Sequence, residues 1–243
     1  MTVLVRHLYL RMMRRSRVIW LIALASVSGL VFWLVGFDSD PDELPELYTD
    51  IVASVGYSFA IAALILASAT LREERDGGTL PYIYMRPMPR TVLAVSAMIA
   101  GAAAASTVAI GGWLATVVAT LAVGADLSVA LPGLALFLSA AIGYAAIFVP
   151  LGYLVPRSLL VGLGYIIVIE TILANAVTGL AQFSIWRISM SIYAAIEDNL
   201  GEIATEVLGP VTAGVGGGVA KLAAALAIGL GALTWALKRR DAL

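Results

Sequence analysis

The stretch TVLAVSAMIAGAAAASTVAIGGWLATVVATLAVGA, from Thr91 to Ala125, contains no charged residue. A helix needs about 20 apolar residues to cross the hydrocarbon layer of a bilayer, which is roughly 30 Å thick. The stretch therefore predicts a membrane-spanning helix over residues 91–123, with length to spare for tilting in the membrane.

The composition of the whole chain agrees with this prediction. Of 243 residues, 61% are hydrophobic and only 13% are charged, and the mean hydropathy is +0.97. A soluble domain of this size could not bury so much apolar surface, so the predicted class is an all-α integral membrane protein. Helices are expected because backbone amides in lipid must be bonded within the segment, and the alternation of barrel strands is missing.

The same criterion predicts six spans within a single transmembrane domain, residues 1–243. They cover residues 18–36, 51–71, 91–123, 128–155, 158–182 and 218–237. The first span follows five arginines and has no clear cleavage site, so we interpret it as a retained helix and not as a signal peptide.

The charges predict how the spans are oriented. Basic residues gather before the first span, in residues 72–90, at Arg157 and after the last span, whereas residues 37–50 and 183–217 are mainly acidic. Because Lys and Arg stay on the cytoplasmic side of membrane proteins, both termini and residues 72–90 are predicted to be cytoplasmic.

Two segments outside the spans have amphipathic patterns. Residues 1–17 place Leu4, Leu8 and Met12 on one side and basic residues on another, which predicts an interfacial elbow helix. This helix is either a basic anchor on anionic lipid or a cuff that also contacts a partner protein. His7 is expected to face solvent or lipid headgroups.

The second amphipathic segment, residues 183–217, is predicted to form an extracellular helical hairpin on the outer surface. A stripe of apolar side chains marks its first helix: Ile185, Ile188, Ile192 and Ile196. Gly201 ends this helix, and residues 202–208 are predicted to form the second one.

The loop between the second and third spans, residues 71–90, reads LREERDGGTLPYIYMRPMPR. It mixes acids and bases, turns at Gly77 and Gly78, and carries Pro87 and Pro89 close together. A short, rigid, charged element of this kind suits docking into a cleft of a soluble partner. The other interpretation is an ordinary solvated connector.

This loop resembles the signature loop of type-2 ABC-transporter permeases. The pattern is E-R-x-x-G-T-L followed by P-x-x-R, and the elbow, the six spans and the outer hairpin extend the resemblance over the chain. The residues that carry it, with the neighbouring acid included as a candidate coupling residue, are Glu73, Glu74, Arg75, Gly78, Thr79, Leu80, Pro87 and Arg90.

The resemblance implies partners and cofactors. Residues 72–90 would contain a coupling helix that docks on a cytosolic ABC ATPase subunit, with two such subunits and a second permease chain in the complex, as a homodimer or related heterodimer. ATP and Mg would be bound by the ATPase, because this chain has no G-x-x-x-x-G-K-[ST] motif. We therefore expect no enzyme activity, cofactor, metal site or nucleic-acid partner in the chain itself, and a prokaryotic plasma membrane as its location.

Absent residue types narrow the chemistry further. The chain has no Cys and a single His, which excludes disulfides, thiol nucleophiles and multi-histidine metal sites. An intramembrane enzyme is disfavoured for this reason. A secondary carrier is disfavoured because the two halves of the chain show no convincing repeat.

One carboxylate, Glu170, lies inside the fifth predicted span, close to Asn175. A charge at mid-bilayer costs about 2.5–3.5 kcal/mol on insertion scales, so it should face protein or water. Glu170 and Asn175 are therefore candidates for a transport pathway. The alternative is a structural carboxyl that is hydrogen-bonded to a neighbouring helix.

Together these features predict the permease subunit of an ABC transporter, an exporter that works by alternating access. The alternative is a non-transporting ABC membrane anchor that transmits ATPase work to an extracytoplasmic partner protein. Glycines in the third span (Gly101, Gly111, Gly112) and in the last (Gly229, Gly231) indicate close helix packing, either within the chain or at a dimer seam.

Overall fold

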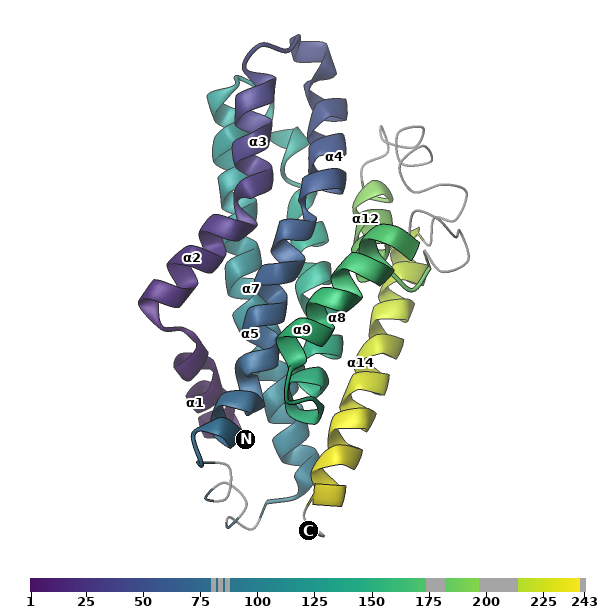
Figure 1. The fold of residues 1–243 in the computed structure, drawn as a ribbon. Helices are drawn as coiled ribbons and strands as arrows, with labels where there is room; N and C mark the ends of the chain where they lie inside the picture. The colour runs from purple at the N-terminus through teal and green to yellow at the C-terminus, as the bar shows by residue number, and fades with distance from the viewer. Residues whose placement is uncertain (80–81, 83–84, 86–87, 174–181, 197–213, 241–243) are drawn as a thin grey trace.

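The computed structural model describes residues 1–79, 82, 85, 88–173, 182–196 and 214–240. Every regular element in these ranges is a helix, which confirms the all-helical class for the described residues. The helices form an elongated bundle, and α1 and the end of α14 lie at the same end of it (Figure 1). In chain order they are α1 Thr2–Met12, α2 Arg15–Ala25, α3 Val27–Gly36, η1 Pro41–Glu43, α4 Leu44–Val55, α5 Tyr57–Asp76, α7 Arg90–Ala122, η2 Leu127–Val129, α8 Gly133–Leu154, α9 Ser158–Tyr165, η3 Ile166–Leu173, α12 Ile185–Ala194 and α14 Gly214–Arg240.

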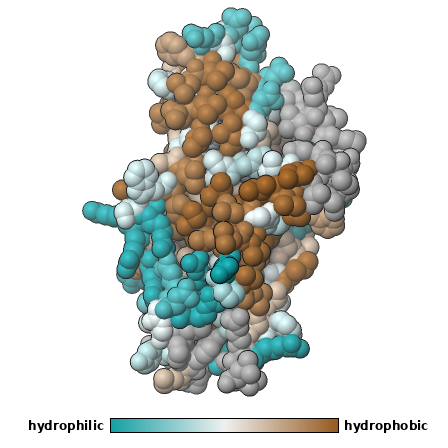
Figure 2. Space-filling view, viewed as in Figure 1, coloured by the Kyte–Doolittle hydropathy of each residue, from teal (hydrophilic) through white to brown (hydrophobic). Residues whose placement is uncertain are grey.

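Three stretches of the described chain are long and apolar enough to cross a membrane: α7, residues 127–154, and α14. Two bent helix pairs, α2 with α3 and η1–α4 with α5, raise this number to five if each pair is one span. The fifth predicted span is apolar over Ser158–Ile172, and residues 174–181 of it lie outside the described residues. Six spans therefore remain a prediction. Hydrophobic side chains cover much of the visible middle of the molecule, and hydrophilic ones gather at its upper end and over α1 and α2 (Figure 2).

The core of the bundle is built around α8, which packs against α5, α7, α12 and α14. Aromatic rings fill its centre. Phe59 lies edge-on to Phe137 at 5.6 Å between ring centroids, and Tyr144 stacks on Phe148 at 5.5 Å. Packing of this kind holds helices together where lipid removes the hydrophobic driving force between them.

Two glycines let α8 approach its neighbours very closely. A Cβ on Gly152 would lie 2.1 Å from the backbone oxygen of Ser68 in α5, and a Cβ on Gly229 of α14 would lie 2.1 Å from the backbone oxygen of Ala146. Gly231, on the same helix as Gly229, has no atom within 4 Å of a built Cβ. The small residue at 229 therefore serves packing within the chain.

The first two predicted spans are not straight. α2 and α3 are bent by 40° at Ser26, and η1–α4 and α5 by 43° at Gly56. At the second bend, a Cβ on Gly56 would lie 2.1 Å from the indole ring of Trp186. The Trp186 indole N–H also donates to the backbone oxygen of Ala53 at 3.2 Å. The bend is therefore filled by a large side chain from α12.

Two elements differ from their predicted form. The acidic stretch 37–50 is not only a loop, because α4 starts at Leu44 and buries Leu44, Tyr48, Ile51 and Val52. These residues follow the i, i+4, i+7, i+8 spacing of one helix face, so the second helical segment begins earlier than residue 51.

The predicted surface helix after residue 183 is instead a packed element. α12 ends at Ala194, before Ile196, and most of its side chains are buried against α8 and α14. Ile185, Ile188 and Ile192 are buried, as the stripe predicted, but Trp186 and Tyr193 on other sides are buried too. The second predicted helix, 202–208, lies outside the described residues.

The N-terminal arm is two elements and not one. α1 ends at Met12, so Arg15 and Arg17 belong to the start of α2. Leu8 and Met12 of α1 are buried, as expected for its apolar side. The helix packs on α7 and α5, which brings it beside the loop that the sequence singled out.

Candidate functional site

The first residues of the signature loop, 71–76, are the last residues of α5, and Gly77 and Gly78 end this helix. Gly78 has a positive φ of 65°, which a residue without a Cβ adopts readily. The Gly78 N–H donates to the Arg75 carbonyl at 3.1 Å, and the Thr79 N–H donates to the Glu74 carbonyl at 3.0 Å. This pair of bonds is a Schellman motif. It turns the chain sharply and brings Thr79 back over the last turn of the helix.

The turn encloses Glu74, whose side chain is only 1% exposed. One carboxylate oxygen lies 2.7 Å from the Arg11 guanidinium and 3.4 Å from Nε2 of His7, both on α1. The Thr79 hydroxyl donates to the other oxygen, and Arg11 in turn donates to that hydroxyl at 3.3 Å. A buried carboxylate needs such partners, because an uncompensated charge away from water is costly.

The residues on either side of Glu74 contact other helices. A Glu73 carboxylate oxygen lies 2.5 Å from the Arg17 guanidinium of α2. Arg75 donates to the backbone oxygen of Tyr153, near the end of α8, at 2.9 Å. Since successive residues of a helix point about 100° apart, these three consecutive residues link α5 to three different helices: α2, α1 and α8.

The other predicted coupling residues are placed as follows. Thr79 and Gly78 lie in the turn, and Arg90 is the first residue of α7. Leu80 and Pro87 lie outside the described residues. Between them, Tyr82 and Met85 have exposed side chains. Glu73, Glu74 and Arg75 thus contact other helices, whereas Tyr82 and Met85 are exposed.

The partners of this cluster were not predicted from the sequence. Arg11 and His7 stand four residues apart and share a face of α1, but nothing in the sequence indicates that this face meets Glu74. His7 was expected to face solvent or headgroups. Its side chain is 58% exposed, yet Nε2 reaches the buried carboxylate.

A family model described as ABC-2 family transporter protein matches residues 12–177. The chain belongs to the ABC-2 transporter family. The matched range runs from the end of α1 into the fifth predicted span and contains the whole signature loop, so the resemblance inferred from the loop is confirmed. No curated protein and no solved structure matches the chain.

Membership in the ABC-2 family fixes the general role of the chain. It is a multi-pass membrane protein of the permease-subunit type, from a family that works with ABC ATPase subunits. The family match also contains Glu170, the carboxylate of the fifth predicted span.

In this ABC-2 chain, Glu170 belongs to η3, and its side chain lies against the N-terminal end of α12. It is fully buried. One of its oxygens accepts from the Tyr165 hydroxyl and the Ile185 N–H, both at 3.0 Å. The other accepts from the Ser184 hydroxyl and from the Trp186 N–H at 3.3 Å. The free N–H groups of a helix N-terminus favour a negative group in this position.

Four donors therefore surround one carboxylate. Three of them belong to Ser184, directly before α12, and to Ile185 and Trp186, the first two residues of α12. Ser184 is also the N-cap of α12, because its hydroxyl accepts from the Arg187 N–H at 3.1 Å. This geometry favours the structural interpretation of Glu170 over a pathway site. Asn175 lies outside the described residues. A Ser directly before the apolar stripe was the signal that could have indicated the cap.

Proposed function

We propose that the chain is the permease subunit of an ABC exporter that moves its substrate by alternating access, with ATP hydrolysed on separate ATPase subunits. The observation that supports this proposal is the triple linkage at the end of α5, where Glu73, Glu74 and Arg75 contact α2, α1 and α8. A displacement of the loop by the ATPase would therefore be transmitted to three helices.

In this mechanism the motif residues transmit motion and do not themselves touch the ATPase. Glu74 is too buried to meet another protein, and Arg75 is bonded to a backbone oxygen of α8. The contact with the ATPase is assigned instead to the outward-facing side chains of the loop, Tyr82 and Met85, which are 69% and 74% exposed. Exposed aromatic and Met side chains are enriched at protein interfaces.

Binding and transmission can be separated by experiment. The tagged chain is purified from the cells that make it, and co-purifying proteins are examined for an ABC ATPase. We expect Tyr82→Ala with Met85→Ala to reduce the amount of ATPase recovered. We expect Arg11→Gln to leave the amount of ATPase recovered per folded chain unchanged but to uncouple the loop from α1.

Uncoupling is measured by cysteine accessibility, because the chain has no Cys of its own. Thr49 is buried on α4, and its hydroxyl lies 3.4 Å from that of Tyr193 in α12. In a Thr49→Cys chain, ATP should change the rate of labelling by a maleimide, and adding Arg11→Gln should reduce that change. A chain that recovers no ATPase, or whose labelling does not respond to ATP, would contradict the proposal.

The second candidate, a non-transporting anchor that passes ATPase work to an outer protein, is kept because of Glu170. This carboxylate is saturated by four donors and so is not free to bind a substrate. The two functions differ in one measurement: an exporter shows ATPase activity that a substrate stimulates, whereas an anchor shows stimulation only by its extracytoplasmic partner.

A further inference from the structure

A cavity of about 330 Å³ lies between α1, α2, α5 and the start of α9. It is distinct from the Glu74 cluster, although the two share Arg11 and Glu73. Its wall carries four arginines, two acids and three apolar residues: Arg11, Arg14, Arg17, Arg72, Glu73, Asp76, Ile65, Ala69 and Leu159.

The charges in the cavity do not cancel. Arg17 pairs with Glu73 at 2.5 Å, and Arg72 pairs with Asp76 at 3.3 Å. Arg14 has no ion pair or hydrogen bond with any side chain in the described part of the chain, and Arg11 has its own acid, Glu74, outside the lining. Four guanidinium groups therefore face two carboxylates, so the cavity attracts an anion.

The cavity is also amphipathic along α5. Ile65, Ala69 and Arg72 are spaced i, i+4 and i+7, so they lie on one face of the helix, and Leu159 adds an apolar side chain from α9. This face passes from apolar to basic at the point where the apolar part of α5 ends. Arg17 and Arg72 are the charged residues next to the first two predicted spans, and such residues mark the level of lipid headgroups.

We propose that this cavity binds one anionic glycerophospholipid. Its phosphate lies among Arg11, Arg14, Arg17 and Arg72, and the first part of an acyl chain lies along Ile65, Ala69 and Leu159. Guanidinium groups suit phosphate because they form paired hydrogen bonds with its oxygens. An apolar wall beneath the arginines fits an amphiphile and offers nothing to free phosphate. Figure 2 shows the same arrangement, with hydrophilic side chains over α1 and α2 next to the hydrophobic surface.

The occupant adds a contact between α1–α2 and α5, which already meet through ion pairs and helix packing. Its phosphate would contact Arg14 at the junction of α1 and α2 and Arg72 on α5. Bound lipid would therefore stabilise the packing of α1 and α2 against α5. This inference does not depend on the proposed transport function.

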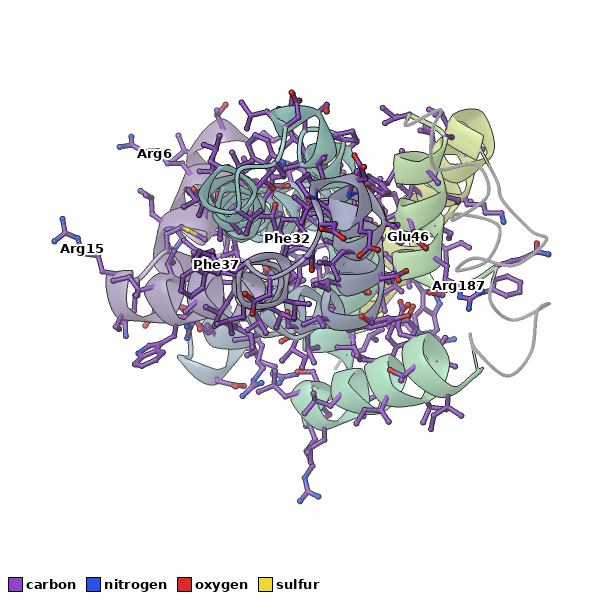
Figure 3. All side chains as sticks on the ribbon, turned by 90° about the horizontal axis from the view of Figure 1, so that it is seen from above. Arg6, Arg15, Phe32, Phe37, Glu46 and Arg187 are labelled. Atoms are coloured by element: carbon purple, nitrogen blue, oxygen red, sulfur yellow. The ribbon has the colours of Figure 1, made fainter. Side chains whose placement is uncertain are left out.

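The test compares lipids and variants on the purified full-length chain in detergent. Phosphatidylglycerol, phosphatidylcholine or inorganic phosphate is added, and both lipid retention in native mass spectrometry and the melting temperature are measured. The test variant is Arg14→Gln with Arg72→Gln. The matched control is Arg6→Gln with Arg15→Gln, because these two arginines are exposed and project away from the bundle (Figure 3).

We expect phosphatidylglycerol to be retained on the unaltered chain and to raise its melting temperature more than phosphatidylcholine does. Because each Arg near an anionic lipid adds about 1 kcal/mol, the test variant should bind phosphatidylglycerol roughly 30-fold more weakly. The control variant should bind within about twofold of the unaltered chain, since its arginines are outside the cavity.

Three results would overturn the proposal. The first is equal retention of phosphatidylglycerol and phosphatidylcholine. The second is an equal loss of binding in the test and control variants, which would indicate general surface charge. The third is stabilisation by inorganic phosphate that matches that of phosphatidylglycerol, which would identify a site for the free anion and not for a lipid.

Discussion

The Arg11 guanidinium of α1 lies 2.7 Å from the carboxylate of Glu74, a side chain that is 1% exposed at the end of α5. This pair joins the N-terminal helix to the signature loop, and Thr79 completes it by donating to the same carboxylate. Removing the cation would leave a buried charge with weaker partners, His7 and Thr79.

We therefore expect Arg11→Gln to destabilise the protein by about 1.5–3 kcal/mol, because it removes the cation that is paired with a buried carboxylate. The measurement is the melting temperature or denaturant midpoint in detergent. Arg6→Gln on the same helix is the control, because its side chain is exposed. In the double variant Arg11→Gln with Glu74→Gln, the loss should be smaller than the sum of the single losses. Additive losses would show that the two groups do not interact.

Glu170→Ala should be among the most damaging single changes in the chain. It would leave the Tyr165 and Ser184 hydroxyls and the first N–H groups of α12 without their acceptor, at a cost of at least about 3 kcal/mol. Ser184→Ala should cost about 2–3 kcal/mol, because it removes both the cap of α12 and a hydroxyl that donates to the buried carboxylate. Ser39→Ala, which removes only a bond within its own chain segment, is the control for both.

The Glu170→Gln variant distinguishes a structural role of Glu170 from a role in the transport pathway. An amide keeps one acceptor oxygen but places an NH2 group against the N–H of either Ile185 or Trp186, so folding should suffer even though the size of the side chain is unchanged. Reduced thermal stability with normal activity per folded molecule would agree with a structural Glu170. Full stability with lost activity would instead restore the pathway interpretation.

The two glycines of α14 should respond oppositely to Ala. Gly229→Ala places a Cβ against the backbone of α8 and should cost about 1–3 kcal/mol. Gly231→Ala meets nothing within the chain and should be neutral or stabilising by about 0.5–1 kcal/mol, because Ala is the better helix former. A Gly231→Ala chain that folds normally but fails to assemble would indicate that a second chain covers this face.

Orientation in the membrane can be tested with single cysteines. Ser39→Cys, between α3 and η1, and Tyr82→Cys, in the signature loop, should react with a membrane-impermeant maleimide from opposite sides. The positive-inside rule predicts that Tyr82 is cytoplasmic and Ser39 is not. Labelling of both cysteines from the same side would remove the basis of the predicted topology.

The sequence predicted best where one physical rule acts alone. The third span was expected at 91–123, and α7 covers Arg90–Ala122. A long charge-free stretch is helical in a bilayer because its backbone groups must be bonded within the segment. The Gly-Gly turn was likewise predicted, since only a positive φ at Gly78 closes the end of α5 in this way.

Features that depend on contacts between distant segments were not predictable. No Pro in the sequence marks the bend at Gly56. The indole ring of Trp186, a residue far away in the sequence, packs against the chain at this bend. The burial of α12 was missed for the same reason, because an apolar stripe indicates one buried face and says nothing about α14 packing on another. Glu74 was predicted as a residue that couples the chain to an ATPase, and this stays a prediction; its contacts with Arg11 and His7 of α1 had no signal in the sequence.

The bends at Ser26 and Gly56 have a mechanical consequence. They flank a single antiparallel hairpin, α3 and α4, whose helices contact each other through the Phe32 and Tyr48 rings at 5.2 Å and lie together at one end of the bundle (Figure 1). The hairpin of α3 and α4 is thus one unit that is connected to the rest of the bundle through a bend at Ser26 and a bend at Gly56. Because α3 also packs on α7, where Gly29 lies against the backbone of Ala115, we expect this hairpin to move together with the C-terminal half of α7 when the chain bends at Ser26 and Gly56.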